Sequence, residues 1–178
     1  MCGRYTLASP NPAMLRERFG LGEEIEIRRR FNVAPTDDVV AVTTTKEGEP
    51  RGDVLRWGLV PFWSKSPTGG AKMINARAET LTERPAFRDA LETRRCLIVA
   101  DGFYEWQRRP DGPKQPWWIT RDDHEPFAFA GLWAIWRPPG EDGEPVRSCT
   151  IITTAANDAI AELHDRMPVI LQPDAEAA

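Results

Sequence analysis

Short apolar runs separated by turns dominate the chain. Such runs cover residues 39–45, 54–57, 96–100, 117–120, 127–136 and 148–154. Gly and Pro residues interrupt them, as at Gly48 and Pro50 between the first two runs. Runs of about four to eight apolar or β-branched residues bounded by turn formers are typical of strands. The pattern therefore predicts a protein built mainly from short β-strands.

Three segments carry helical signals. Residues 12–19 begin with Pro12, have Asn11 as an N-cap and are followed by Gly20, which is the usual punctuation of a short helix. Residues 85–92 and 155–163 also predict short helices. Many strands with few helices indicate an α+β fold, so we expect one β-rich domain over residues 1–178.

Length and hydropathy limit the classes of protein to which the chain can belong. Its 178 residues suit one domain with a full core, and neither an internal repeat nor a linker interrupts them. No apolar run approaches the ~18 residues of a membrane span, and residues 1–12 lack the apolar core of a signal peptide. We therefore expect no membrane partner and a location in the cytoplasm with the nucleoid, or in the nucleus of a eukaryotic host.

Charge and cysteine content narrow the functional classes. A net charge of −4 argues against general polyanion binding, so nucleic-acid binding requires local clustering of the 23 Lys and Arg residues. Seven Trp residues either fill the core or, beside arginines, suit stacking on unpaired bases. Cys2, Cys96 and Cys149 are odd in number and lack CxxC spacing, which favours reduced thiols without a bound metal. Cys96 and Cys149 lie in apolar runs and are expected in the core, and no cofactor is expected.

The second residue, Cys2, offers an unusual chemistry. Removal of Met1 would leave an α-amine, with a pKa of about 7.7–8.0, and a thiol, with a pKa of about 8.5, on one residue. With an aldehyde, the amine forms a Schiff base and the thiolate closes it to a five-membered thiazolidine. Position alone favours the alternative that Cys2 is merely the second residue of an edge strand.

The polar candidates elsewhere are Asn75, Arg77, Glu79, Glu105 and His164. Glu105 lies between two aromatic residues, where an apolar neighbourhood suits proton transfer, or it points outward from an alternating strand. Asn75 and Arg77 share a strand face and suit a substrate oxygen and a phosphate, or they are surface residues. His164 is either a general acid or base or a structural residue at a helix end.

Six sequence blocks together resemble the SOS response-associated peptidase family. They appear in the family's order and span residues 2–170, nearly the whole chain. The blocks are Cys2-Gly3-Arg4-Tyr5, Phe31-Asn32-Val33-Ala34-Pro35, Trp57-Gly58-Leu59-Val60-Pro61 with Trp63, Asn75-Ala76-Arg77-Ala78-Glu79-Thr80, Gly102-Phe103-Tyr104-Glu105-Trp106 and His164-Asp165-Arg166-Met167-Pro168.

The resemblance implies twisted antiparallel sheets or an open barrel, and a sensor of abasic sites in single-stranded DNA. In this family the mature N-terminal Cys forms a thiazolidine with the ring-opened sugar aldehyde, which gives a stable DNA–protein crosslink. Carried over, Cys2 is the nucleophile and Asn75 orients the terminus and the sugar. Glu105 serves the proton transfers, and His164 assists sugar opening or reversal of the crosslink.

The resemblance also assigns residues to DNA binding: Arg4, Asn32, Pro35, Trp63, Arg77 and Arg166. The arginines would hold phosphates, and the other three would border the DNA groove. A few focused arginines can bind a DNA backbone despite an acidic total charge. The expected partner is single-stranded DNA containing abasic sites, bound by a monomer.

Two alternatives remain open. One is a thiol peptidase in which Cys2 attacks a peptide carbonyl with His164 or Glu105 as base, an activity compatible with crosslinking if it serves only to remove Met1. The other is a non-covalent module that binds single-stranded DNA through Trp63 and the arginines. The family usually continues beyond its Met-Pro-Val-Ile block, so an end at Ala178 is expected to leave a strand edge unpaired.

Overall fold

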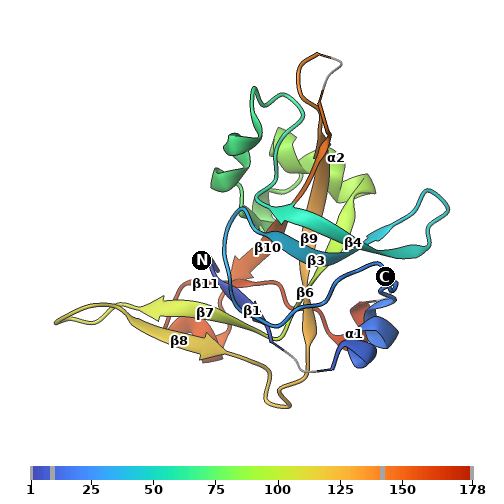
Figure 1. The fold of residues 1–178 in the computed structure, drawn as a ribbon. Coiled ribbons are helices and arrows are strands. Elements are labelled where there is room, and N and C mark those ends of the chain that lie inside the picture. The colour runs from blue at the N-terminus through green and yellow to red at the C-terminus, as the bar shows by residue number, and fades with distance from the viewer. Residues whose placement is uncertain (1, 9–10, 141–142, 177–178) are drawn as a thin grey trace.

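The computed structural model describes residues 2–8, 11–140 and 143–176 (Figure 1). The strands are β1 (Tyr5–Leu7), β2 (Arg30–Val33), β3 (Asp38–Thr44), β4 (Pro50–Trp57), β5 (Asn75–Arg77), β6 (Arg95–Ala100), β7 (Gly102–Gln107), β8 (Gln115–Ile119), β9 (Phe127–Trp136), β10 (Val146–Ala155) and β11 (Arg166–Pro168). The helices are α1 (Pro12–Phe19), α2 (Pro85–Thr93) and α3 (Asp158–Ala161), with 3-10 turns η1 (Pro67–Lys72), η2 (Ala78–Thr80) and η3 (Pro173–Ala175).

Five of these strands close into a barrel. Their order is β10-β4-β3-β6-β9, and β9 pairs back onto β10. Most of the pairs are antiparallel, whereas β10 runs parallel to β4 and to β5. The predicted β-rich α+β fold is confirmed, and the pairing of β9 with β10 closes the barrel.

Strand β10 organises the region around the candidate site. Ile151 pairs with β9 on one edge and with β5 on the other, at Asn75. Two residues later, Thr153 pairs with Arg77 of β5 and with Pro168 of β11. Strands β5 and β11 therefore flank β10 on opposite edges at Thr153.

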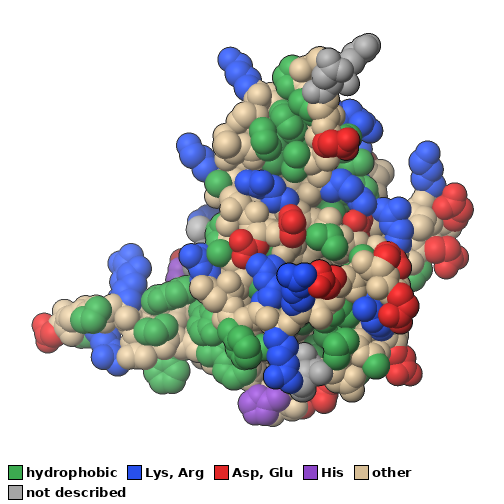
Figure 2. Space-filling view, in the orientation of Figure 1, with side chains coloured by type: hydrophobic (Ala, Val, Ile, Leu, Met, Phe, Trp, Pro, Cys, Tyr) green, Lys and Arg blue, Asp and Glu red, His purple; other side chains and the backbone are tan. Residues whose placement is uncertain are grey.

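A second sheet carries the N-terminal strand. Its order is β2-β1-β7-β8, and the β7–β8 hairpin projects away from the barrel at the lower left of Figure 1. Hydrophobic and basic side chains cover the projecting hairpin (Figure 2). The carboxylate of Asp101, which lies between β6 and β7, accepts hydrogen bonds from the Thr6 hydroxyl and the Ala8 N–H. These bonds fasten β1 beside the start of β7.

The two sheets share one hydrophobic core. Tyr5 of the second sheet packs edge-on against Trp57 and Phe129 of the barrel, with ring centroids 5.3 and 5.7 Å apart. Cys96 and Cys149 are buried and unbridged, and burial raises the pKa of both thiols. The apolar runs that contain them are the barrel strands β6 and β10.

The helix predictions have different outcomes. The predicted helix at residues 12–19 coincides with α1, with Asn11 accepting the capping hydrogen bond and Gly20 in the left-handed conformation. The predicted helix at residues 85–92 is α2. The predicted helix at 155–163 is wrong in extent, because β10 continues through Ala155 to pair with β11 and leaves only α3. None of the helices in the described part of the chain has the length and apolar character that crossing a membrane requires.

Candidate active site

Cys2 lies three residues before β1 and is completely buried. The side-chain Nδ2 of Asn75, the first residue of β5, donates a 2.8 Å hydrogen bond to the Cys2 carbonyl oxygen. The Cys2 Sγ lies 3.7 Å from the Arg4 carbonyl oxygen. Asn75 Oδ1 is also buried and has no hydrogen-bond partner within the described part of the chain. Through this Asn75 hydrogen bond, strand β5 on the barrel side holds the main chain of Cys2 in place.

The environment of the Cys2 thiol keeps it protonated. Burial raises its pKa to about 12, and the negative charge of Glu105 contributes to the increase. A thiol in this state must lose its proton as it reacts, so it needs a base nearby. The predicted removal of Met1 concerns a residue that lies outside the described ranges.

Glu105 points into the protein. Its side chain belongs to the inward face of β7, two residues after the core residue Phe103, and the residue is 4% exposed. Of the two orientations that the sequence allowed, the structure therefore shows the inward one. Because side chains alternate along β7, Glu105 lies on the same face of the sheet as Phe103, whose partner in β1 is the buried Tyr5.

A cleft of about 600 Å³ opens beside Glu105. One wall is the β7–β8 hairpin, and the other is the segment that runs from α3 to β11. The lining residues are Glu105, Trp106, Arg108, Lys114, Glu162, Leu163, His164 and Asp165. The fold thus brings Glu105 and His164, which are remote in sequence, to opposite walls of one cleft.

Sequence reasoning missed the two basic residues of this cleft, Arg108 and Lys114. Both flank the turn that closes the β7–β8 hairpin, immediately after the Gly-Phe-Tyr-Glu-Trp block. Their position in a Pro- and Gly-rich turn indicated a solvated loop. The signal that points to them is the hairpin pairing, because it places both residues beyond Gln107 and Gln115, next to the cleft.

His164 presents its Nδ1 to both a donor and an acceptor. The Arg166 peptide nitrogen lies 2.9 Å from Nδ1, and the Asp165 Oδ1 lies 2.8 Å from it. In the neutral imidazole, Nδ1 accepts from the Arg166 N–H and the proton resides on Nε2. In the protonated imidazole, Nδ1 instead donates to the Asp165 carboxylate. The ring is partly exposed, with 28% of its side-chain surface accessible.

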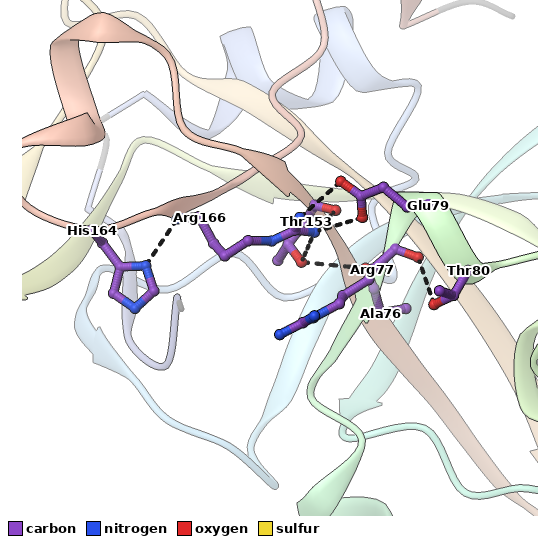
Figure 3. A network of polar contacts seen from close by, with 7 residues as sticks. All are labelled: Ala76, Arg77, Glu79, Thr80, Thr153, His164 and Arg166. Carbon is purple, nitrogen blue, oxygen red and sulfur yellow. Dashed lines mark hydrogen bonds and ion pairs between the residues drawn. The ribbon is translucent and has the colours of Figure 1, made fainter.

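Arg166 is held in a polar network, shown in Figure 3. Its two terminal nitrogens form hydrogen bonds of 2.7 and 3.0 Å to the two oxygens of Glu79. The same guanidinium donates to the Thr153 carbonyl oxygen at 2.7 Å and to its hydroxyl at 3.2 Å. The hydrogen bond from Arg166 lowers the pKa of Glu79 to about 2. Only 12% of the Arg166 side chain is exposed, so most of its donors already serve the protein.

Arg77 has a different arrangement from Arg166. Its residue is exposed at the end of β5, and its guanidinium is directed away from Glu79 (Figure 3). Its carbonyl oxygen accepts from the Thr80 hydroxyl at 3.5 Å, whereas its side chain extends outward. Arg4 is half-buried, and its Nη1 donates to the Gly3 carbonyl oxygen at 2.9 Å. Of the three arginines assigned to phosphates, Arg77 is the most accessible.

The three other residues assigned to the DNA groove do not line this cleft. Trp63 is 50% exposed, packs edge-on against Phe62 and lines a separate shallow groove beside α2. Asn32 is exposed on β2, and Pro35 is half-buried just beyond that strand. The structure therefore links Cys2 to Asn75 and places Glu105 and His164 in one cleft, whereas the three predicted groove residues lie outside that cleft.

The described residues contain no preformed metal-binding site. Among residues 2–8, 11–140 and 143–176, no cluster of three or more His, Cys, Asp or Glu residues could hold a metal ion.

The sequence matches a known family over its full length. The model of the family described as "SOS response associated peptidase (SRAP)" matches residues 1–178. The chain belongs to this family. The resemblance inferred from the six sequence blocks is thus confirmed.

Curated relatives share a common description. The abasic site processing protein YoqW of Bacillus subtilis is 44% identical over 179 residues, covering 99% of this chain and 78% of its own. The abasic site processing protein YedK of Escherichia coli is 33% identical over 180 residues, covering 98% of this chain and 77% of its own.

Solved structures share the fold. A crystal structure of a protein from Bacteroides thetaiotaomicron superimposes with a TM-score of 0.85 at 27% identity, covering 98% of this chain and 79% of that one. A Bordetella bronchiseptica protein superimposes with a TM-score of 0.78 at 28% identity, covering 99% and 86% of the two chains.

Proposed function

We propose that this SRAP protein recognises abasic sites in single-stranded DNA and captures them covalently through Cys2 once Met1 has been removed. The observation that carries the proposal is the hydrogen bond from Asn75 to the Cys2 carbonyl, and the negative charge of Glu105, which raises the pKa of the Cys2 thiol, supports it. Glu105 also lines the cleft that His164 faces. The relatives described as abasic site processing proteins support the same substrate.

The proposed capture consumes the aldehyde of the ring-opened sugar. The Cys2 α-amine attacks the aldehyde carbon, and loss of one water gives a Schiff base. The sulfur then adds to the imine carbon while the thiol proton passes to the imine nitrogen, which closes the thiazolidine. One water leaves overall, and neither an oxidant nor a reductant is needed.

Proton transfer in this sequence falls to Glu105. The thiol pKa of about 12 means that the sulfur retains its proton until the addition step. Glu105 is the carboxylate whose charge already acts on this thiol, so it is positioned to accept the proton and return it to nitrogen. His164, on the opposite wall of the cleft, would assist sugar opening and reversal of the crosslink.

The DNA strand would be held by groups around the cleft. Arg77 is exposed and suits a phosphate directly. Arg4 and Arg166 would add phosphate contacts, although Arg166 is bound by Glu79 in this structure. Trp63 would stack on bases farther along the strand, since it lies in a separate groove. Asn32 and Pro35 would border the same path, and one copy of the chain is expected to suffice.

A second candidate activity is peptide cleavage limited to self-processing. Cys2 is completely buried, so any external reactant, whether a peptide or a DNA aldehyde, must first displace the groups that cover it. The carbonyl of Met1, by contrast, is bonded to the nitrogen of Cys2. Removal of Met1 by the Cys2 thiol would therefore precede capture and would explain a thiol-dependent hydrolase that acts on itself.

Intact-mass measurement tests the proposal. Purified protein is mixed with abasic single-stranded DNA, and the free protein in the same sample reports whether Met1 is gone. We expect an adduct at the summed mass less one water, absent with undamaged DNA and absent from Cys2→Ala. An adduct of undiminished yield in Cys2→Ala would sink the thiazolidine mechanism. Binding without an adduct from the folded, Met1-free protein would favour the non-covalent module.

A further inference from the structure

We propose that Glu79 is a positioning residue for His164. Through Arg166, its carboxylate ties the strand that carries Asn75 to the strand that follows His164, and so keeps the imidazole in the Nε2–H form. The inference rests on the proposed function for its kinetic consequence, whereas its structural part can be tested without DNA. Glu79 has no direct contact with Cys2 in this scheme, so it acts through Arg166.

The Glu79–Arg166 pair bridges two strands across a third. Glu79 lies in η2, directly after β5, and Arg166 is the first residue of β11. Strands β5 and β11 flank opposite edges of β10 at Thr153. The Arg166 guanidinium crosses over this point, bonding Glu79 on one side and both oxygens of Thr153 beneath it (Figure 3). Three strands are thereby fastened together by one side chain.

The short length of β11 makes this fastening important. It is only three residues long, so few ladder hydrogen bonds hold its first residue in place. A two-pronged bond between a guanidinium and a carboxylate fixes both distance and orientation, which a single hydrogen bond does not. With Arg166 anchored in this way, its peptide N–H is directed at His164 Nδ1 from 2.9 Å. Loss of the Glu79 carboxylate would let the Arg166 peptide N–H turn away from His164 Nδ1.

The orientation of the Arg166 N–H has a chemical consequence. A donor on Nδ1 requires that nitrogen to be the acceptor, so the ring proton resides on Nε2. Asp165 has the opposite effect on the ring, because its carboxylate oxygen lies 2.8 Å from Nδ1 and favours a proton on that nitrogen. The Arg166 N–H therefore decides between two states of His164. The other charged groups around the cleft are Glu105, Arg108, Lys114 and Glu162.

A rival role for Glu79 makes a different prediction. Glu79 could act as an internal competitor that occupies the Arg166 guanidinium until a DNA phosphate displaces it. Removal of its charge would then tighten DNA binding and increase the salt dependence, because Arg166 would gain a phosphate contact. Under the positioning role, Arg166 stays bound to Thr153, and affinity changes little.

The experiment compares Glu79→Gln with Glu83→Gln, which removes the same charge from an exposed position four residues later. Three quantities are measured: the single-turnover capture rate at saturating DNA, the Kd with its salt slope, and the ¹⁵N shifts of the His164 ring nitrogens, with His124 as internal reference. Glu79→Asp, which keeps a carboxylate, and Arg166→Lys, which keeps the charge but loses the two-pronged donor, complete the set.

We expect Glu79→Gln to slow capture about tenfold at unchanged Kd, a part of the 10²–10⁴-fold that a positioned acid or base supplies. Arg166→Lys should slow capture to a similar extent, whatever its effect on Kd. The His164 shifts should move from the Nε2–H pattern toward a mixture, with partial recovery in Glu79→Asp and no effect in Glu83→Gln. Unchanged His164 shifts in folded Glu79→Gln, or tighter DNA binding at an unchanged capture rate, would overturn the inference. If the wild-type protein forms no adduct, the proposed function fails, and the ¹⁵N shifts alone still decide the role of Glu79.

Discussion

The Asn75 side-chain amide donates a 2.8 Å hydrogen bond to the main-chain carbonyl of Cys2. The bond uses the carbonyl of Cys2 and leaves its nitrogen untouched, so it can hold the residue both before and after Met1 is removed. Asn75 Oδ1, buried without a partner among the described residues, offers an acceptor close to the same residue. We therefore expect the amide to fix the terminus before the substrate arrives.

The role of Glu105 can be tested with Glu105→Gln. Glutamine keeps the size of the side chain but cannot accept a proton at neutral pH, so we expect the capture rate to fall about 10²-fold while DNA affinity stays within about twofold. Rapid-quench single-turnover kinetics and an equilibrium binding titration measure the two effects. Equal losses of rate and affinity would instead identify Glu105 as a structural residue.

Arg77 should contribute to DNA affinity through charge. Because Arg77 is exposed and its guanidinium points away from Glu79 (Figure 3), Arg77→Ala should weaken binding to abasic and undamaged strands alike. It should also reduce the slope of log K against log salt by about 0.7, the value for one phosphate contact on a single strand. The control is Lys46→Ala, in the β3–β4 turn on the side of the barrel away from the N-terminus (Figure 1). An equal effect of the two variants would argue against a specific Arg77 contact.

The protein should lose stability in alkali because its buried acidic groups ionise only after unfolding. Burial raises the pKa of Cys2 from 9.0 to about 12, and the pKa of Tyr5 is also raised by burial. The contribution of Cys2 is fully present below pH 9 and is lost as the pH rises toward 12, because only the unfolded thiol ionises in that window. Each such group lowers the free energy of unfolding by about 1.4 kcal/mol per pH unit there.

Urea unfolding at pH 8, 9 and 10 measures this loss, and the change in tyrosinate absorbance between wild type and Tyr5→Phe reports Tyr5 ionisation. Cys2→Ser should reduce the slope between pH 9 and 10, because a hydroxyl does not titrate in that range. A free energy of unfolding that stays constant from pH 8 to pH 10 would contradict the expected ionisation behaviour.

A partly buried ion pair at one end of the barrel should stabilise the fold without affecting the site. Asp53, on the inward face of β4, accepts a 2.7 Å hydrogen bond from Arg147 and a 3.1 Å bond from the Thr43 hydroxyl. The Arg147 guanidinium also lies 4.8 Å from the ring centroid of Trp133. Asp53→Ala would leave Arg147 without its carboxylate, so we expect a loss of about 3 kcal/mol in the free energy of unfolding.

The measurement is urea denaturation, with Asp53→Asn as the milder comparison because it keeps an acceptor for Thr43. Capture by the folded fraction should be unchanged in both variants. A loss below about 1 kcal/mol in Asp53→Ala would show that water replaces the carboxylate at this end of the barrel.

Local signals predicted the regular elements well where they are strong. The N-cap at Asn11, Pro12 and Gly20 all agree on α1, and the β-branched runs of the barrel agree on β3 and β6. The helix predicted at residues 155–163 failed because residues 153–155 pair with β11, and a long-range pairing overrides local preference. Periodicity within a segment contains no information about such a partner.

The family was evident in the amino-acid order alone. The chemistry of an aminothiol depends only on Cys2 itself, and six ordered blocks are sufficient to place the chain in its family. The orientation of Glu105 was not evident, because alternation shows which residues of β7 share a face but not which face the protein covers. The Glu79–Arg166 bond was not evident from the sequence either, because it forms only when β5 and β11 lie on opposite edges of β10. Residue chemistry is local and therefore readable from the chain, whereas burial and pairing arise only when distant segments pack together.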